Sequence, residues 1–311
     1  MTGILRGPTL WLADRRLVRR VVTETGMGRR LVDRFVAGDT LEAGIAAARS
    51  LHVQGVATML DHLGENAETA DQADAATDAY VRALKRIRDS PDIDCNISVK
   101  LTQLGLDISM AQCAENMERV LQAAADEGGA TLVMIDMEAR PYVDPTLQTY
   151  LELRDRYRNI GLCLQAYLRR SDADAHLIAG PGAIVRVAKG AYLEPPEFAH
   201  RTRRAVRRSF ARIAATLLGK GSIVHVATHD PRLIAGARRF IRARSISNRR
   251  YEFQMLYGIR RDLQRILVSQ GEPVRVYVPY GTRWYPYLTR RLAERPANVW
   301  FFVSNLLARG G

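Results

Sequence analysis

The sequence lacks the features that mark disulfide-rich, zinc-thiolate or membrane-spanning proteins. Its three cysteines, Cys95, Cys113 and Cys163, are widely spaced and form no CxxC pair, which argues against a disulfide framework and a cysteine zinc site. No apolar run reaches the roughly 18 residues that a membrane-spanning helix needs, and residues 1–16 do not resemble a cleaved signal peptide. We therefore expect a cytoplasmic protein with buried thiols.

Lysine and nucleic-acid motifs are also scarce. Four of the 46 basic residues are lysines and the rest are arginines, and the net charge of +13 attracts any polyanion without choosing among them. The arginine runs at 201–208 and 237–250 contain no acidic residue, but they lack a recognised nucleic-acid motif and a pattern of interleaved stacking aromatics. We expect no nucleic-acid partner, and favour a solvated surface or one that faces anionic lipid. GxGxxG, Walker A and HExxH motifs are absent as well.

The sequence does contain a regular alternation of two kinds of segment. From residue 53 onward, short apolar runs rich in β-forming residues alternate with longer amphipathic stretches, several of which begin with Asp, Ser or Pro. The predicted strands are 53–60, 95–101, 131–138, 160–167, 183–190, 222–229, 251–256 and 274–280. The predicted helices are 66–89, 109–127, 145–157, 171–179, 196–219, 231–243, 259–270 and 283–295. This order is typical of βα units around a parallel sheet.

Length and segment order together favour one closed barrel. The 311 residues lie within the range of about 200 to over 400 for single (β/α)8 barrels, and no linker divides the predicted units. We predict a (β/α)8 TIM barrel over 53–311; a doubly wound sheet is the alternative. Residues 1–52 carry basic helical patterns and are predicted to form a helical segment that flanks the barrel.

Polar residues follow most of the predicted strands. Active sites of such barrels lie at the C-terminal ends of the strands, so these residues are candidates for ligand contact. They are Asp61, Lys100, Asp136, Gln165, Lys189, His229, Leu256 and Tyr280. Desolvating charged groups at successive strand ends costs free energy unless they are paired, which favours a functional barrel mouth. Solvated loop residues are the alternative.

Two further patterns have both a functional and a structural interpretation. Arg186 and Lys189, three residues apart on one strand, project to opposite faces, and the inward cation needs a phosphate, a flavin or a carboxylate such as Asp136. His225 and His229 share a strand face and could bind a metal with Asp136 or Glu138. We favour neutral hydrogen-bonding histidines and predict no metal.

The last predicted helix carries a cluster of charged residues. Tyr287, Arg290, Arg291 and Glu294 occupy adjoining helix faces. A surface salt bridge between arginine and glutamate is one interpretation. The other is a carboxylate clamp, because two guanidinium groups can bind one carboxylate through charge-assisted hydrogen bonds.

These segments together resemble the catalytic domain of proline dehydrogenase, the FAD-dependent enzyme that begins proline catabolism. The motifs that carry the resemblance are LDHLGE (60–65), SVKLTQLGLD (98–107), IDMEA (135–139), LQAY (164–167), RVAKGAY (186–192), ATHD (227–230), YEFQMLYG (251–258), VYVPYG (276–281) and YLTRRLAE (287–294). They span about residues 53–305 and look like the monofunctional form, without a fused aldehyde dehydrogenase domain. The resemblance implies a distorted (β/α)8 barrel with noncovalent FAD and a last helix over the barrel mouth.

The resemblance also implies roles for residues at the substrate. Arg290, Arg291 and Lys100 would bind the proline carboxylate, and Asp136 would orient the cations. Packing against the proline ring is implied for Leu256, Tyr277 and Tyr287. Glu65 looks like the partner of Arg290 in an ion pair that gates the site, and Glu294 would hold the last helix near the flavin.

On the cofactor side, Arg186 would lie by flavin N5 and Gln165 would hydrogen-bond the pyrimidine portion. The remaining cofactor contacts that the resemblance implies are Lys189, Gly190, Ala191, Tyr192, Thr228 and His229. The chain departs from the family pattern at Leu193, where Trp is frequent, and at Asp230, where Asn is frequent.

The activity implied is hydride transfer from L-proline to FAD, giving 1-pyrroline-5-carboxylate in the first step of proline catabolism to glutamate. A membrane quinone would reoxidise the flavin, so the protein would be cytoplasmic and peripherally bound to the anionic inner face of the cell membrane. A further partner is 1-pyrroline-5-carboxylate dehydrogenase. Tyr277 implies a preference for proline over 4-hydroxyproline. The alternatives are another FAD barrel, similar to methylenetetrahydrofolate reductase, and a non-catalytic basic barrel.

Overall fold

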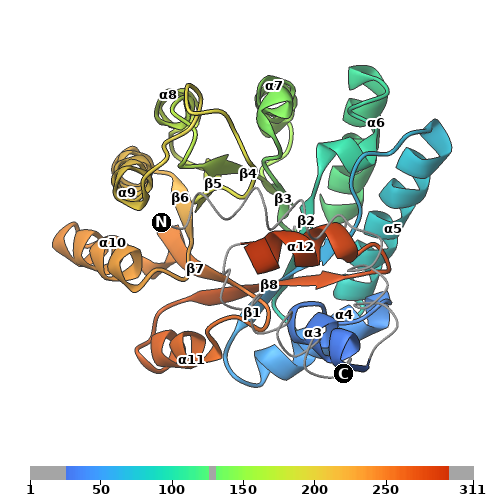
Figure 1. The fold of residues 1–311 in the computed structure, drawn as a ribbon, viewed down its shortest axis with the longest axis horizontal. Coiled ribbons are helices and arrows are strands. Elements are labelled where there is room, and N and C mark those ends of the chain that lie inside the picture. Colours follow the sequence, from blue (N-terminus) through green and yellow to red (C-terminus); the bar gives the residue numbers. More distant parts are fainter. Residues whose placement is uncertain (1–25, 126–130, 294–311) are drawn as a thin grey trace, which may run out of the picture.

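The computed structural model describes residues 26–125 and 131–293, and eight parallel strands form a closed barrel in this part of the chain (Figure 1). The strands follow one another around the barrel in sequence order, and the last pairs with the first. They are β1 (Ala57–His62), β2 (Cys95–Val99), β3 (Val133–Ile135), β4 (Ile160–Gln165), β5 (Ile184–Ala188), β6 (Ile223–Ala227), β7 (Tyr251–Leu256) and β8 (Val274–Tyr280). The predicted (β/α)8 barrel is confirmed, and the doubly wound sheet is wrong.

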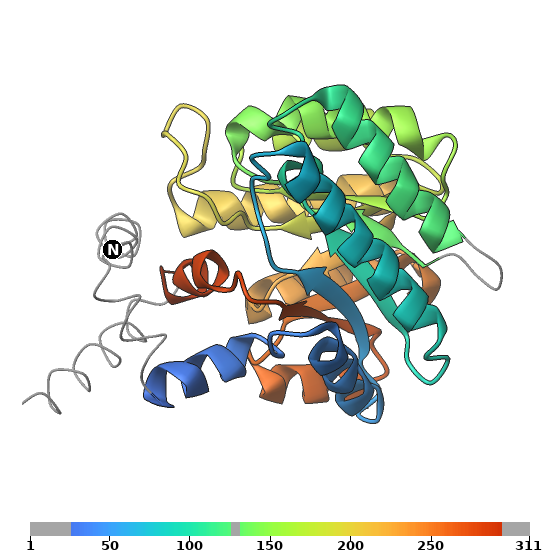
Figure 2. The ribbon, with the colours of Figure 1, turned by 90° about the vertical axis from the view of Figure 1, so that its right-hand side faces the viewer.

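Helices surround the barrel and close one of its ends (Figures 1 and 2). The outer helices are α5 (Ala70–Arg88), α6 (Met110–Ala125), α7 (Val143–Arg154), α8 (Ser171–Ile178), α9 (Arg203–Gly219), α10 (Pro231–Ala243) and α11 (Arg261–Ser269). Helix α12 (Tyr285–Ala293) lies across the C-terminal ends of the strands, as the resemblance implied, and not in the outer ring. Short 3-10 helices lie at η1 (Leu101–Leu104), η2 (Arg140–Tyr142) and η3 (Asn248–Arg250).

Within the described residues, the barrel is preceded by α3 (Gly26–Phe35) and α4 (Leu41–His52). The segment between them bonds to the end of the last strand: the N–H of Ala37 donates to the carbonyl of Pro279 at 2.8 Å, and Gly281 N donates to Gly38 O at 2.8 Å. These helices are therefore attached to the barrel wall. A separate segment over 1–52 stays a prediction, and residues 1–25 lie outside the described part.

Local sequence explains where several elements differ from their predicted bounds. Strand β1 begins at Ala57 and not at residue 53, because Val53 ends α4 and Gly55 makes a turn at φ +73°. Helix α9 begins at Arg203 and not at residue 196, because the Thr202 hydroxyl accepts from Ala205 N and caps the helix. Proline-rich sequence before it, at 195–196, stays outside the helix.

The barrel interior is apolar in one part and strongly polar in another. Met59, Leu132 and Met134 form a buried apolar cluster. Beside it, the buried Arg275 donates from Nε to Glu252 Oε1 at 3.0 Å and from Nη1 to the carbonyl of Thr58 at 2.8 Å. From Glu252, hydrogen bonds continue through Gln254 and Arg186 to Asp136 at the strand ends.

Candidate active site

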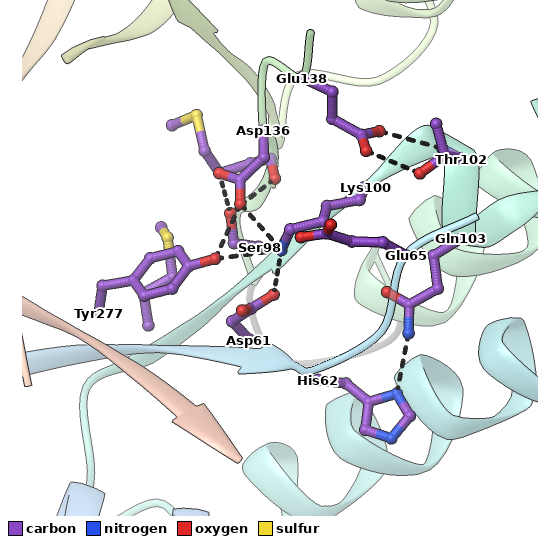
Figure 3. A network of polar contacts seen from close by, with 12 residues as sticks. Asp61, His62, Glu65, Ser98, Lys100, Thr102, Gln103, Asp136, Glu138 and Tyr277 are labelled. Carbon is purple, nitrogen blue, oxygen red and sulfur yellow. Dashed lines mark hydrogen bonds and ion pairs between the residues drawn. The ribbon is translucent and has the colours of Figure 1, made fainter. Parts of the chain in front are cut away.

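Four polar side chains from four neighbouring strands, β8, β1, β2 and β3, meet at the barrel mouth (Figure 3). Lys100 Nζ, after β2, lies 2.8 Å from Asp61 Oδ1 on β1 and 3.3 Å from Asp136 Oδ2, which follows β3. The Tyr277 hydroxyl on β8 donates to Asp136 Oδ2 at 2.8 Å. Asp61 is fully buried and Lys100 is only 5% exposed. The predicted strand-end residues Asp61, Lys100 and Asp136 thus lie together.

The charges of this cluster stabilise one another. Burial alone would lower the pKa of Lys100, but attraction by Asp61 and Asp136 outweighs burial and raises it well above its usual value. Burial would raise the pKa of Asp136, yet Lys100 and Arg186 lower it. Both groups are therefore ionised near neutral pH. Asp61 Oδ2 is buried and accepts no hydrogen bond from the residues that the structure describes.

Arg186 on β5 is the second cation of this cluster, and it faces the barrel interior. Its Nη1 donates to Asp136 Oδ1 at 2.5 Å and to Ser98 Oγ at 3.2 Å, while Nε donates to Gln254 Oε1 at 2.6 Å. Its guanidinium carbon lies 5.4 Å from the centre of the Tyr277 ring. The carboxylate partner considered from the sequence, Asp136, is thus present.

Arg290 on α12 faces the mouth and is held by two loops. Both terminal nitrogens of its guanidinium donate to Glu65, in the loop between β1 and α5. Its guanidinium carbon lies 5.8 Å from the ring centre of Tyr192, in the loop between β5 and α9. Glu65 raises the pKa of Arg290, against the effect of burial, so this arginine remains charged. The Arg290 and Glu65 side chains are only 17% and 20% exposed, so their ion pair is largely shielded from solvent. The surface salt bridge considered from the sequence would involve Glu294, which lies outside the described residues.

The other residues of α12 anchor the helix. Tyr287 is 5% exposed, and the Arg291 guanidinium carbon lies 5.2 Å from its ring centre. The apolar cluster that receives the helix consists of Val32, Phe35, Val36, Leu63, Tyr287 and Leu288. Helix α12 therefore rests on α3 and on the loop after β1. Glu294, predicted to hold this helix near the flavin, lies outside the described residues.

Gln165 at the end of β4 connects two loops on the other side of the mouth. Its amide nitrogen donates to the carbonyl of Glu138 at 2.8 Å, and its amide oxygen accepts from the N–H of Ala191 at 3.2 Å. Next to Ala191, Gly190 has φ +110°, and a Cβ there would lie 2.0 Å from Tyr167. Glycine is therefore required at 190 by the packing of Tyr167.

The predicted cofactor residues after β5 and β6 lie near one another. Lys189 Nζ donates to Asp230 Oδ2 at 2.8 Å, and Arg207 Nε donates to the same oxygen at 2.6 Å. Thr228 Oγ1 accepts from the N–H of Asp230 at 3.1 Å. Burial would raise the pKa of Asp230, but the hydrogen bonds from Lys189 and Arg207 lower it to about 2. Asp230 is therefore an anion that partly neutralises the positive charges of Lys189 and Arg207.

The histidines considered as metal ligands have other partners. His229 Nε2 accepts from the N–H of Leu256 at 2.9 Å, and His225 Nδ1 lies 2.9 Å from the amide nitrogen of Gln254. Burial lowers the pKa of His225 to about 4, so its ring is neutral near pH 7. Across residues 26–125 and 131–293, no group of three or more His, Cys, Asp and Glu side chains is placed to hold a metal.

Sequence patterns assign no role to Ser98 or Gln254, although both take part in the network. Strand periodicity could have indicated both residues. Ser98 and Gln254 lie two residues before the strand-end residues Lys100 and Leu256, and alternate residues of a strand share a face. Asp61 is aligned with Ser98 in the register of β1 and β2. The predicted mouth residue Tyr280 lies outside the network, buried with its ring centre 5.4 Å from that of His62.

The fold and site define a (β/α)8 barrel enzyme whose mouth, lined by buried cations beneath a helix, suits a small anionic substrate. The proline dehydrogenase family model matches residues 45–303. The chain is 34% identical over 303 residues to proline dehydrogenase 2 of Bacillus subtilis (strain 168), covering 97% of this chain and 99% of that protein. It is also 34% identical to proline dehydrogenase of Deinococcus radiodurans, covering 98% of each. The chain therefore belongs to the proline dehydrogenase family.

A solved structure shows the same fold. Proline utilization A from Bdellovibrio bacteriovorus, inactivated by N-propargylglycine, superposes with a TM-score of 0.80 at 22% identity. The match covers 94% of this chain and spans 36% of that longer one. Family membership gives this chain the enzyme class of a proline dehydrogenase, an oxidoreductase of proline catabolism, and implies proline as the substrate. In the described ranges, no helix is both long and apolar enough to cross a membrane.

Proposed function

We propose that the protein oxidises L-proline to 1-pyrroline-5-carboxylate with noncovalent FAD as the electron acceptor, the first step of proline catabolism to glutamate. The observation that carries the proposal is that α12 lies across the barrel mouth (Figure 2), where its Arg290 pairs with Glu65, while the buried Lys100 lies at the end of β2 in the same mouth. Two cations from different elements suit the carboxylate of a small amino acid. Arg291 and Asp136 complete the proposed substrate group, Arg291 as a second clamp and Asp136 by orienting Lys100.

The residues around the mouth fit FAD by the chemistry of their donors. Arg186, Lys189 and Arg207 supply cations, and Gln165 retains a second amide hydrogen after its bond to Glu138. Cations suit the pyrophosphate, and an amide suits the carbonyl-rich end of a flavin. The proposed cofactor residues are Gln165, Arg186, Lys189, Gly190, Ala191, Tyr192, Thr228, His229 and Glu294. When bound, FAD supplies the two-electron acceptor that no protein side chain offers.

The protein's own contribution to the reaction is position and charge. Arg290, Arg291 and Lys100 bind the proline carboxylate, while Leu256, Tyr277 and Tyr287 pack on its ring and fix its orientation. Tyr277 is itself fixed, because its hydroxyl donates to Asp136 at 2.8 Å. Arg186 would stabilise the negative charge of the reduced flavin. Glu65 closes the site when it pairs with Arg290 and opens it when that pair loosens.

The proposal is tested by the anaerobic visible spectrum of the purified protein before and after addition of L-proline. We expect flavin bands near ~450 nm that bleach with proline, because hydride transfer reduces the flavin. A yellow protein that proline fails to bleach would point to another flavin-barrel reductase. A colourless protein that cannot be reconstituted with FAD would overturn the enzyme function itself.

Asp230 provides a test of whether Lys189 and Arg207 contact the phosphates of FAD. Asp230→Asn removes one negative charge beside Lys189 and Arg207 and keeps an N-cap for α10. We expect FAD to bind about three- to tenfold more tightly, because both cations become available to its phosphates. The measurement is flavin titration of the apoprotein. Asp172→Asn, which removes a carboxylate paired with Arg212 on the surface, is the control; weaker FAD binding by Asp230→Asn would contradict the assignment.

Tyr277 is proposed to select proline over 4-hydroxyproline. Its ring is partly buried and its hydroxyl is held by Asp136 at 2.8 Å, which leaves little freedom to move aside for an extra hydroxyl group on the substrate. We expect kcat/KM for 4-hydroxyproline to be at least about tenfold below that for proline, and Tyr277→Ser to narrow the ratio. The measurement is steady-state kinetics with both substrates. Comparable turnover of both by the unaltered protein would remove this role from Tyr277.

A membrane quinone is the proposed oxidant of the reduced flavin, and 1-pyrroline-5-carboxylate dehydrogenase the proposed recipient of the product. Peripheral binding to the anionic inner face of the cell membrane is supported by exposed arginines on neighbouring helices α9 and α10. They are Arg203, Arg204, Arg208, Arg232, Arg239 and Arg242. The exposed apolar residues Leu193 and Phe198 lie in the loop that leads into α9.

Vesicle sedimentation tests the membrane proposal. We expect binding to vesicles with about one-third anionic lipid at low salt, lost as salt screens the surface, and no binding to neutral vesicles. Replacing Arg203, Arg204 and Arg239 with glutamate should abolish sedimentation without changing flavin content. Equal recovery of the unaltered protein with anionic and neutral vesicles would rule out the electrostatic contact.

A further inference from the structure

Glu138 is a buried carboxylate beside the mouth that belongs to neither the substrate nor the cofactor group. It follows β3 by three residues and is 4% exposed. Its two oxygens accept from one residue of η1: Oε1 from the N–H of Thr102 at 3.1 Å and Oε2 from the Thr102 hydroxyl at 2.7 Å (Figure 3). Burying a carboxylate costs free energy unless it is hydrogen-bonded, and Thr102 supplies both of these hydrogen bonds.

Thr102 holds the loop that carries Glu65. Its hydroxyl oxygen accepts from the N–H of Asn66 at 3.2 Å, and its carbonyl accepts from the N–H of Ala67 at 2.9 Å. Because the hydroxyl hydrogen points to Glu138, its oxygen lone pairs are directed toward Asn66. Asn66 has φ +51°, in the left-handed region that asparagine adopts more readily than most other non-glycine residues. Glu138 therefore supports the backbone next to Glu65 through one intervening side chain.

The same short segment holds the second loop against Arg290. Two residues after Glu138, the N–H of Arg140 donates to Glu194 Oε1 at 2.7 Å, and the Arg140 guanidinium carbon lies 4.2 Å from the ring centre of Phe198. These contacts fix the chain that follows Tyr192. The carbonyl of Glu138 also accepts from Gln165, which binds Ala191 in the same loop. Both loops that flank Arg290 are thus tied to the segment 138–140.

We infer that Glu138 is a positioning residue: its ionised carboxylate sets the loop of Glu65, and thereby the place of Arg290, without touching the substrate. The inference rests on the proposed function, in which Arg290 binds the proline carboxylate. It predicts that loss of the Glu138 charge weakens proline binding and leaves the chemistry of the bound substrate almost unchanged.

The surroundings of Glu138 make its support of the Glu65 loop sensitive to pH. Burial raises the pKa of Glu138 to about 7, against the hydrogen bonds from Thr102 and the attraction of Lys100. The charged and titratable groups that face it are Lys100, Glu65, Cys113, Tyr142 and Tyr192. Protonation removes one acceptor for Thr102, so we expect the KM for proline to rise as pH falls through about 7.

Stability should change in the opposite direction. The folded pKa of about 7 exceeds the ordinary value of 4.5, so the native state holds a proton that the unfolded chain releases between these pH values. This contribution favours folding below pH 4.5 and is lost as pH rises through about 7. Glu138→Gln, which keeps the size of the side chain and removes the charge, should therefore melt at the same or a higher temperature than the unaltered protein at pH 8.

The experiment compares Glu138→Gln and Thr102→Val with the unaltered protein and with Asp174→Asn. Asp174 is a matched control, because it is a buried carboxylate on α8 whose pKa burial also raises. Kinetics with L-proline between pH 6 and 8.5, flavin content, melting temperature and amide hydrogen exchange at 65–67 are measured. We expect Glu138→Gln and Thr102→Val each to raise the KM for L-proline at least about fivefold at pH 8, with kcat within about twofold of the unaltered protein. The amide hydrogen of Asn66 should also exchange faster in both variants.

The measurements distinguish failure of this inference from failure of the proposed function. If the unaltered protein does not oxidise proline, the proposed function fails, and hydrogen exchange at Asn66 still decides whether Glu138 holds this loop. Unchanged KM and unchanged exchange in Glu138→Gln would overturn the inference. A parallel fall of melting temperature, kcat and flavin content would also overturn it, because that pattern reflects general loss of structure. Glu138→Gln should also abolish the rise in KM near pH 7.

Discussion

Replacing Arg290 with methionine is expected to raise the KM for L-proline by about 100-fold, while FAD stays bound. Two charge-assisted hydrogen bonds are worth roughly 3 kcal/mol together, and each 1.4 kcal/mol is a factor of ten in binding. Methionine preserves much of the side-chain volume over Tyr192, so packing changes little. Steady-state kinetics and the flavin-to-protein ratio make the measurement.

A matched surface variant separates this effect from loss of positive charge alone. Arg119→Met on α6 removes an arginine paired with Asp78, where both side chains are about half exposed, so we expect an unchanged KM. The same kinetics in Arg290→Met as in Arg119→Met would mean that the guanidinium over the mouth does not bind proline.

Lys100→Met is expected to lower the free energy of unfolding by about 3–5 kcal/mol, because it leaves a buried carboxylate without its cation. Asp136 retains Arg186 as a partner, but Asp61 is fully buried and loses its ion pair. The cost should therefore fall mainly on Asp61. Proline binding should fail as well, since Lys100 is one of the proposed carboxylate ligands.

The double variant Asp61→Asn/Lys100→Met isolates this cause. Removing the charge of Asp61, which has lost its ion pair with Lys100, should recover most of the lost stability and none of the proline binding. Urea unfolding of the two single variants and the double variant provides the free energies, and their non-additivity measures the coupling of the pair. A double variant no more stable than Lys100→Met would show that Asp61 does not bear the cost.

The sequence was sufficient to predict the order of the barrel but not the partners of its polar residues. Alternating apolar runs and amphipathic stretches reveal eight βα units, because strand and helix periodicities are local properties. The ends of elements were less predictable: β3 has only three residues, Val133–Ile135, where 131–138 was expected. Strand pairing across the barrel, and not local pattern, decides where such a strand stops.

For the site too, local sequence predicts the positions of residues but not their contacts across the barrel. Placing Lys100 and Asp136 at the mouth follows from where their strands end. Asp136 as a partner of Arg186 was one open possibility, and the pairing of Lys100 with Asp61 was not foreseen, because such contacts depend on how side chains meet across a closed barrel. The helical pattern of 283–295 equally allowed an exposed surface helix. Only the resemblance pointed to α12 lying over the mouth, where Arg290 reaches Glu65.

The contact between α12 and α3 has a consequence for how the protein is made. Leu288 and Tyr287 near the end of the described chain pack with Val32 and Phe35 near its beginning, and β8 pairs with β1 to close the barrel. These contacts have very large sequence separation, so they form after most of the chain has left the ribosome. A nascent chain that already contains seven strands still lacks both the closing strand and the helix that completes the mouth. Catalytic competence should therefore arise in one late step of synthesis, and premature termination before α12 should yield a barrel that cannot hold proline.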